Sequence, residues 1–420
     1  MKYYDVTLRH DFVNDCPAKG DIKLSNIADD KALEIVSQYL RKIIKKESLM
    51  EPAGILKHKY LVPGGGYTTL WDWDSFFMAC SIDDELLEYA KGSVSNLIEN
   101  MGEDKKPAKN VSLDGESDPR CTPLPLQAQY AYVIAKRLND FSWVEKYWDS
   151  LEKMIEWFDT HCTNNGYYVY PNLYGNGIDN NPAVYGRGTM STSPCDLISF
   201  MYREFCAMKK LAHMFCPHRE DYYKRKAEEL KAFFQEKYFD QMDKCFYSID
   251  CNTNPGEITM QGVNWVTYLK FRSWANIFPL WAGLATKEQA ECVRKYIMSE
   301  EHFLSVCGIR SHAKSDPVYN NVAMGNPSNW QGPVWGLSTF LTAYALARYG
   351  YRDDAVNVSM RLIKTYANDI LQNGCIHEYY NGDTGQPVIR PYFTSWNVMA
   401  LRVVEDIENN IDLTTFDLLD

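Results

Sequence analysis

Twelve segments of helical hydrophobic periodicity divide the sequence, and they alternate between two types. A charged, one-sided segment is followed by a long loop, and then by a segment richer in apolar and small residues. The connection to the next charged segment is only a few residues long. The predicted helices span residues 29–46, 74–81, 84–100, 122–138, 140–161, 195–214, 218–237, 276–284, 287–299, 333–349, 352–371 and 393–407.

This alternation predicts an all-α fold, the (α/α)6 toroid or six-hairpin barrel. A helix that is apolar around most of its circumference is buried, whereas a one-sided helix lies outside. Six such pairs therefore predict an inner ring wrapped by an outer ring. An irregular helical protein or a helical solenoid is the alternative, and the absence of a fixed-period repeat disfavours the solenoid. The long loops, predicted at one end of the ring, are 47–73, 101–121, 162–194, 238–275, 300–332 and 372–392.

No linker rich in Pro, Gly or Ser interrupts the helices, which predicts one catalytic domain over residues 28–420. Residues 1–27 are expected to form an irregular or short extended lead-in packed on the barrel. Loop 101–121 is polar, and we expect it to face solvent. The alternating segment 238–251 predicts a hairpin inside its loop.

Charge and composition exclude several classes of partner. The formal net charge of −11 argues against nucleic acid, whose phosphates need clustered Lys and Arg. The N-terminus lacks a signal-peptide core, and no apolar run approaches the roughly 20 residues of a membrane span. The twelve cysteines are scattered without CxxC pairs, as expected of reduced thiols. We therefore expect a cytoplasmic protein with no membrane partner, and the sequence leaves a homo-oligomeric state open.

The stretch GGGYTTLWDWDSFFMAC crowds aromatic rings and carboxylates behind a glycine run. Tyr67, Trp71 and Trp73 offer flat apolar faces with polar edges, which complement the faces and rim of a sugar ring. Asp74 lies where an apolar helix is expected to begin and could accept sugar hydroxyls. Core packing of the tryptophans, with Asp74 as a helix N-cap, explains the stretch equally well.

Three further loops hold candidates. Asp179, in GNGIDNNPAVYGRG, could be an acid in a partly apolar setting, although an Asx turn is the simpler explanation. Trp330 and Trp335, in GNPSNWQGPVWG, indicate either an aromatic wall or core packing. Gln127 and Gln129 lie at the start of a predicted helix, from which either could reach a ligand hydroxyl. A capping or surface amide is the simpler explanation for both. Loop 162–194 leads to Asp196, a second expected N-cap.

Glu378 lies between His377 and two tyrosines in NGCIHEYYNGDTGQP. Burial of a carboxylate among aromatic rings is costly unless it is paired or kept for chemistry. A salt-bridged loop glutamate is the alternative explanation.

Four of these motifs, in this order, resemble the catalytic domain of glycoside hydrolase family 63: GGGYTTLWDWDS, GIDNNPAV, NWQGPVWG and HEYYNGDTG. The likeness covers about residues 60 to 405. It is strongest to the small bacterial enzymes that hydrolyse mannosylglycerate or glucosylglycerate, and trehalases share the toroid more distantly. This resemblance implies that Asp179, in the G-x-D-N-x-P motif, is the general acid and that Glu378 is the general base.

The resemblance also implies the sugar-binding residues and no cofactor or metal. The residues that it implies are Tyr67, Trp71, Trp73, Asp74, Trp330 and Trp335. Two further candidates are Gln127, which could reach a ligand hydroxyl from the start of its helix, and Gln331, which lies between the two late tryptophans. This chain has Gln331 where the family usually has Arg, and Asn181 where Ser is common. It also has CTPLPLQAQ where a Q-P-P run is common. These departures leave the sugar and the aglycone open, and so do Arg187, Arg310 and Arg390, which sequence does not place.

The implied reaction is inverting hydrolysis of a small α-glucoside or α-mannoside. Protonated Asp179 would protonate the glycosidic oxygen, while ionised Glu378 would activate a water on the opposite face, which needs carboxyls about 6.5–9.5 Å apart. A sugar epimerase on the same toroid is one alternative; it would use histidines, of which His302, His312 and His377 lie in late loops. A non-catalytic carbohydrate-binding toroid is the other.

Overall fold

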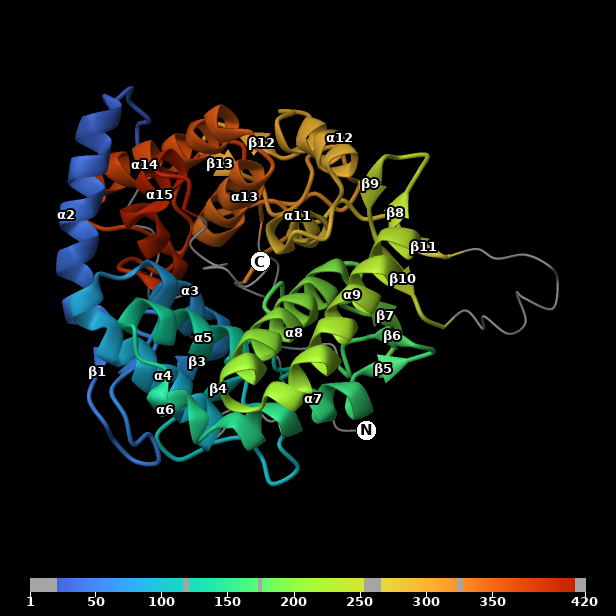
Figure 1. Cartoon of the computed structure of the whole chain (residues 1–420). Coiled ribbons are helices and arrows are strands. Elements are labelled where there is room, and N and C mark those ends of the chain that lie inside the picture. Colours follow the sequence, from blue (N-terminus) through green and yellow to red (C-terminus); the bar gives the residue numbers. More distant parts are fainter. Residues whose placement is uncertain (1–20, 116–120, 173–175, 253–265, 323–327, 412–420) are drawn as a thin grey trace, which may run out of the picture.

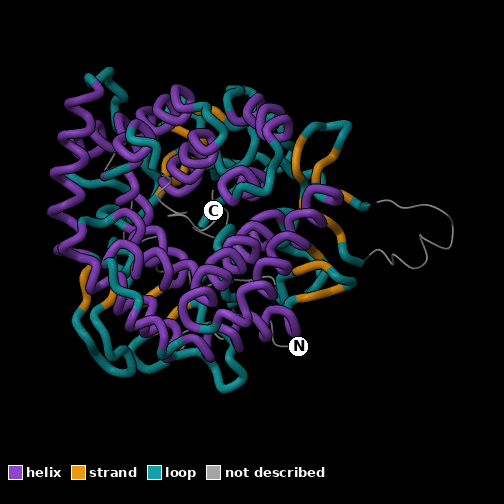
Figure 2. The backbone as a smooth tube through the Cα atoms, viewed as in Figure 1, coloured by secondary structure: helices purple, strands orange, loops and turns teal. Residues whose placement is uncertain are grey.

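The computed structural model describes residues 21–115, 121–172, 176–252, 266–322 and 328–411. Helices dominate this part of the chain, and its strands are only two or three residues long (Figure 2). Residues 1–20 of the expected lead-in and 116–120 of the second long loop lie outside the described residues.

Most of the outer helices bury one face each. In α2 the buried residues Val36, Leu40 and Ile44 recur at helical spacing, with acids in the first turn and lysines in the last, as the helix dipole favours. The outer helices are α2 (Asp29–Glu47), α4 (Leu87–Glu99), α7 (Trp148–His161), α9 (Glu220–Lys237), α12 (Lys287–Ile297) and α14 (Arg352–Asn373).

The inner helices are buried on most of their surface, and α3 buries every residue it contains. Two inner positions are built from a 3-10 turn joined to a short α-helix. The inner elements are α3 (Asp72–Ser81), α5 (Gln127–Leu138), α8 (Cys195–Phe215), η4 (Trp274–Ile277) with α11 (Phe278–Ala282), α13 (Gly336–Arg348), and η5 (Ser395–Leu401) with α15 (Val403–Glu408).

The inner elements form a closed ring. Each packs against the next in chain order, and η5 packs back against α3. The outer helix α2 lies along α14 in the same way, so the two ends of the ring meet side by side (Figure 1). The expected (α/α)6 toroid is therefore confirmed.

Several helix boundaries differ from those predicted. α3 begins at Asp72, and Trp71 occupies its N-cap position, so the predicted N-cap role of Asp74 is wrong. Asp196 is likewise inside α8, whose N-cap position is Pro194. The predicted helix 140–161 is divided into α6 (Ser142–Glu145) and α7. Two further 3-10 turns are η2 (Asp84–Leu86) and η3 (Pro217–Arg219).

Short antiparallel strands tie the long loops together. Each long loop leads into an inner helix, which places these loops at the N-terminal end of the inner ring. Strand β3 (Leu70–Trp71) pairs with β4 (Asn110–Val111), and β14 (Val334–Trp335) pairs with β15 (Tyr379–Tyr380). The remaining pairs are β1 (Leu49–Met50) with β2 (Tyr60–Leu61), β5 (Thr163–Asn164) with β6 (Tyr167–Tyr168), and β12 (Leu304–Ser305) with β13 (Gly308–Ile309).

The hairpin predicted within 238–251 is confirmed, because β8 (Phe239–Asp240) pairs with β9 (Cys245–Phe246). The end of that segment does not belong to it. Strand β10 (Ser248–Asp250) pairs instead with β7 (Thr192–Ser193) and β11 (Tyr268–Leu269).

The described end of the lead-in is tied down by side-chain amides. Gln372 accepts a hydrogen bond from the Lys23 N–H at 2.8 Å and donates one to the Lys23 carbonyl at 2.9 Å. Asn368 binds both backbone groups of Ser25 in the same way. These amides lie on α14, so residues 22–25 follow the outside of the ring.

No disulfide joins the described cysteines, and most of them are buried. Within the described part of the chain, no helix combines the length and apolar character needed to cross a membrane. The assignment of residues 28–420 to one domain stays a prediction.

Close packing between α13 and η5 generates a stability prediction. A Cβ atom at Gly336 would lie 2.3 Å from Asn397 Oδ1 and 2.7 Å from Tyr366 Oη. Gly336→Ala should therefore destabilise the ring by about 1–3 kcal/mol, as overpacking does. Thermal unfolding tests this, with Gly188→Ala as the control, because a Cβ there meets only Ser191 at 4.0 Å. An unchanged unfolding midpoint in Gly336→Ala would show that the neighbouring side chains move aside without a cost in stability.

Candidate active site

Glu378 directly precedes the strand that joins the sixth long loop to the fifth. Tyr379 and Tyr380 follow it in β15, where Tyr379 is in register with Trp335 of β14. The Glu378 N–H donates to the Ile389 carbonyl at 3.0 Å, which folds the loop back beside the carboxylate. The residue is buried, with only 5% of its surface exposed. Backbone pairing on both sides therefore fixes the position of this carboxylate.

Asp179 lies half-buried on a loop that is seated on Trp73. A Cβ atom at Gly177 would lie 2.5 Å from the Trp73 ring, and Gly177 has a φ of +94°. Only glycine tolerates both this approach and this backbone conformation. The indole of Trp73 thus fixes the position of the loop that carries Asp179.

A second attachment joins the aspartate loop to the loop that precedes α13. Asn180 accepts a hydrogen bond from the Trp330 N–H at 2.7 Å and donates one to Asn329 at 2.9 Å. The side chain of Gln331 donates to the Asn180 carbonyl at 2.9 Å. Gln331, predicted to bind substrate, therefore holds the loop that carries Asp179.

The charges around Glu378 place the two candidate carboxyls in one electrostatic environment. The pKa of Glu378 is raised to about 8, chiefly because burial removes water from the carboxyl. The charges of Asp74 and Asp179 also raise that pKa, whereas Arg390 and a hydrogen bond with Tyr67 lower it. Because Coulomb interactions weaken with distance, this mutual influence means that the loops bring these residues together.

Asp74 is buried in the first turn of α3 and accepts a hydrogen bond from the Ser395 hydroxyl at 2.7 Å. Burial raises its pKa to about 7, although this hydrogen bond and the charge of Lys109 lower it. Ser395 was not predicted; its bond to Asp74 crosses the junction where the ring closes.

The second long loop contributes a buried cation, which corrects the expectation that residues 101–121 face solvent. Lys109 is buried, and its ammonium lies 2.8 Å from Asp72 and 5.4 Å from the ring centre of Trp73. Asn110 is buried beside it in β4. The pairing of β4 with β3 draws this polar segment inward, a tertiary effect that local sequence does not signal.

The predicted tryptophans form a packed cluster. Trp330 and Trp335 stack 4.1 Å apart and nearly parallel, so these two faces cover each other. Trp73 contacts both Trp330 and Trp396. Trp71 alone among the four predicted tryptophans is half-buried, and its indole nitrogen is buried without a hydrogen-bond partner among the described residues. Core packing therefore describes Trp73, Trp330 and Trp335, and sugar binding by the tryptophans stays a prediction.

Gln127 and Gln129 are fully buried in the first turn of α5, so a surface position is wrong for both. Gln129 donates to Glu204 at 3.0 Å and accepts from Arg203, which gives it a structural role. The amide nitrogen of Gln127 has no hydrogen-bond partner among the described residues. Gln127 therefore remains a candidate for binding a sugar hydroxyl.

The three arginines that sequence could not place fall in different surroundings. Arg187 pairs with Asp250 at 2.7 Å, and Arg310 lies 3.5 Å from Asp383. Arg390 lies 3.6 Å from Glu378. Of these three, Arg390 is the one paired with a candidate catalytic carboxylate.

One group of described residues has the composition of a metal site: Asp369, Cys375 and His377. His377 Nδ1 is 2.7 Å from Asp369 Oδ2, and the hydroxyl of Tyr380 donates to the same oxygen at 2.7 Å. Direct hydrogen bonds therefore already join the side chains that would bind the ion. We interpret the cluster as a support for the segment that carries Glu378 into β15.

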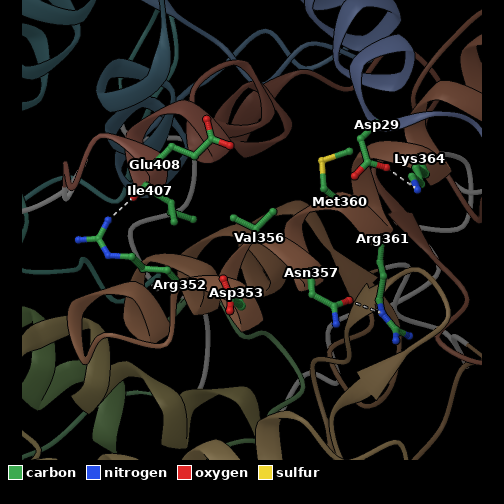
Figure 3. Close-up of a pocket in the computed structure, with 10 residues that line it drawn as sticks. All are labelled: Asp29, Arg352, Asp353, Val356, Asn357, Met360, Arg361, Lys364, Ile407 and Glu408. Carbon is green, nitrogen blue, oxygen red and sulfur yellow. Dashed lines mark hydrogen bonds and ion pairs between the residues drawn. The ribbon is translucent and has the colours of Figure 1, made fainter.

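A groove of about 660 Å³ lies elsewhere, along the outside of the ring (Figure 3). Its walls come from α2, α14 and α15, and Lys364 forms an ion pair with Asp29 across it. It contains none of the predicted site residues. The residues that line it are Asp29, Arg352, Asp353, Val356, Asn357, Met360, Arg361, Lys364, Ile407 and Glu408.

The fold is a helical toroid whose long loops carry buried carboxylates and aromatic rings. Residues 67–396 match the mannosylglycerate hydrolase MGH1-like glycoside hydrolase domain, and the chain belongs to that family.

Individual relatives agree with this assignment. Mannosylglycerate hydrolase MGH1 of Selaginella moellendorffii is 30% identical over 118 residues, which are 28% of this chain and 22% of that protein. The GH63 mannosylglycerate hydrolase of Thermus thermophilus, solved with glucose, shares the fold at a TM-score of 0.65 and 17% identity, over 88% of this chain and 99% of its own. Neutral trehalase Nth1 of Saccharomyces cerevisiae shares the fold at a TM-score of 0.61 and 16% identity, over 90% of this chain and 83% of its own.

The buried charge of Asp74 generates a stability prediction. Because its folded pKa is raised to about 7, the folded state binds the proton more tightly, and the free energy of unfolding falls as pH rises from about 4 to 7. Asp74→Asn removes the charge while its amide oxygen can still accept from Ser395. Its unfolding midpoint should exceed that of the wild type at pH 8, by about 2–4 °C for each kcal/mol gained, and match it near pH 4.

The control for this measurement is Glu228→Gln, because Glu228 is exposed on α9. Its midpoint should follow that of the wild type at both pH values. An equal midpoint of Asp74→Asn and wild type at pH 8 would contradict a buried charge at Asp74.

Proposed function

We propose that this chain is an inverting α-glycosidase that hydrolyses a small α-glucoside or α-mannoside, with Asp179 as general acid and Glu378 as general base. The observation that carries the proposal is that the charge of Asp179 raises the pKa of Glu378, although the two lie on separate loops. Hydrolysis with inversion needs such a pair, because one carboxyl protonates the leaving oxygen while the other activates water.

The proposed roles require one proton to be held between the two carboxyls. Coupled carboxyls titrate as a pair, so the raised pKa of Glu378 means that the pair keeps a proton near neutral pH. Arg390 lies 3.6 Å from Glu378 and favours the ionised form there. The proposed roles require that this proton reside on Asp179 and that Glu378 be ionised when the substrate is bound.

The substrate class follows from the family and from the surroundings of the pair. Two of the three relatives named above are mannosylglycerate hydrolases, one of them solved with glucose, and the third is a trehalase, which supports an α-linked hexose. Asp74 and Gln127 are buried polar groups suited to bind hydroxyls of such a sugar. Water enters from the face of the ring opposite the departing aglycone.

The family membership favours hydrolysis over an epimerase or a non-catalytic toroid. Two of the histidines that an epimerase would use each contact a different carboxylate. His377 bonds to Asp369, and His312 lies 3.3 Å from Asp316. A cytoplasmic location also belongs to this proposal.

Neutral substitution of either carboxyl tests the assignment. Asp179→Asn and Glu378→Gln should each lower kcat by about 10²–10⁴-fold with the fold intact, because each removes a proton-transfer group whose contribution is of that order. Steady-state hydrolysis of an aryl α-glucoside or α-mannoside measures this. Near-normal turnover in either variant would refute the assignment. Glu301→Gln, an exposed carboxylate, is the control.

The stereochemical course provides an independent test. Proton NMR during the first minutes of hydrolysis should show the β-anomer of the released sugar, because a single displacement inverts the anomeric centre. The α-anomer would refute inversion, and an interconverted sugar without a new reducing end would indicate epimerisation. A panel of α-glucosides, α-mannosides, trehalose and glycerate conjugates then identifies the preferred aglycone.

A further inference from the structure

Arg390 occupies an unusual backbone conformation in the loop that returns past Glu378. Its φ is +47°, and that of Tyr392 is +69°. Such left-handed conformations are unfavourable for residues other than glycine and persist only where surrounding contacts impose them. Here the Tyr392 N–H donates to the Ile376 carbonyl at 2.9 Å, and the Glu378 N–H donates to Ile389. The two bonds flank Arg390 and hold it beside the carboxylate.

The guanidinium is enclosed by the glycine-rich turn on one side and by Glu378 on the other. Its Nε lies 3.6 Å from Glu378 Oε2, and its carbon lies 4.2 Å from the ring centre of Tyr67. Its Nη1 donates to the Gly65 carbonyl at 3.4 Å. Only 13% of the Arg390 side chain and 7% of the Glu378 side chain are exposed. The pair is therefore shielded from water and salt.

The charges that face Glu378 come from every side of the site. Asp74 and Asp179 are negative and disfavour a second negative charge, as does burial. Tyr67 hydrogen-bonds to the carboxyl, and Tyr379 adjoins it in the chain. Arg390 is the positive group that acts on Glu378 among these neighbours. Its positive charge lowers the pKa of Glu378, whereas the charges of Asp74 and Asp179 raise it.

The position of Arg390 also distinguishes two functions for a cation in this site. A cation that binds an anionic aglycone must lie on the leaving-group side of the sugar. In an inverting enzyme the base lies on the opposite side, where the water enters. Because Arg390 pairs with Glu378, it lies on the side of the water.

We propose that Arg390 is a positioning residue, whose guanidinium holds the Glu378 carboxylate ionised and oriented toward the attacking water. This inference rests on the proposed function. Tyr67 belongs to the same unit, because its ring supports the guanidinium while its hydroxyl bonds to the carboxylate. The role differs from the sugar contact that sequence alone predicts for Tyr67.

The pH dependence of kcat/KM tests the proposal with Arg390→Gln and Arg390→Lys. Activity of a general base rises with pH through its pKa, and removal of a nearby cation raises that pKa. The acidic limb of Arg390→Gln should move up by about one pH unit or more, with about tenfold lower kcat at pH 7 and recovery at higher pH. Arg390→Lys keeps the charge and should shift less. A purely structural role would lower activity at every pH without moving the limb.

Arg294→Gln is the matched control. Arg294 also forms an ion pair with a carboxylate, Asp354, and lies 4.7 Å from a tyrosine ring centre, but on the outer helices. The acidic limb of the pH profile of Arg294→Gln should coincide with that of the wild type. A higher KM confined to glycerate conjugates in Arg390→Gln, with an unmoved limb, would overturn the proposal in favour of an aglycone contact.

A thermal-unfolding cycle tests the pair without turnover. At pH 9, Glu378→Gln should raise the unfolding midpoint in the Arg390→Gln background, because it removes a buried charge that has lost its cation. In the wild-type background the same change should raise the midpoint less or lower it. Equal changes in both backgrounds would overturn the pairing. If the cycle shows coupling but no glycoside is hydrolysed, the proposed function fails while the pairing stands.

Discussion

The packing of η5 against α3 is the contact on which the ring and its site both depend. It joins elements that are more than 300 residues apart in the chain, and it is made of polar as well as apolar groups. Trp73 meets Trp396 with ring centres 5.5 Å apart, and Ser395 bonds to Asp74 beside them. A break in this contact would open the toroid and separate two walls of the site together.

The closed ring encloses three carboxyls that are costly to ionise. Asp74, Asp196 and Glu378 are all buried, and burial raises the pKa of each. Like charges destabilise a folded protein, so this arrangement persists only because the surrounding ring is extensively packed. The cations Lys109 and Arg390 offset part of the repulsion. Stability elsewhere in the toroid supports a site that is costly to fold.

The architecture could be predicted from sequence because helical periodicity and loop length are local properties. The alternation of one-sided and apolar helices was sufficient for the toroid, and motif order was sufficient to recognise the family. Pairing between distant segments was not accessible in this way. Lys109 looked solvent-facing because its neighbours are polar, yet β4 pairs with β3 and buries it. Arg390 was noticed but could not be placed, since its contact with Gly65 spans most of the chain.

The attachment of the Asp179 loop to its neighbour uses amides throughout. Asn180, Asn329 and Gln331 supply the bonds, and Gln331 stands where the family usually has arginine. Amides carry no net charge, so counterions do not screen these bonds and proton exchange does not break them. The general-acid candidate is thus held by contacts indifferent to ionic strength, while the opposite carboxylate depends on a cation. The amide attachment is therefore unaffected by titration near neutral pH, whereas the ion pair with Arg390 is lost when Glu378 takes up a proton.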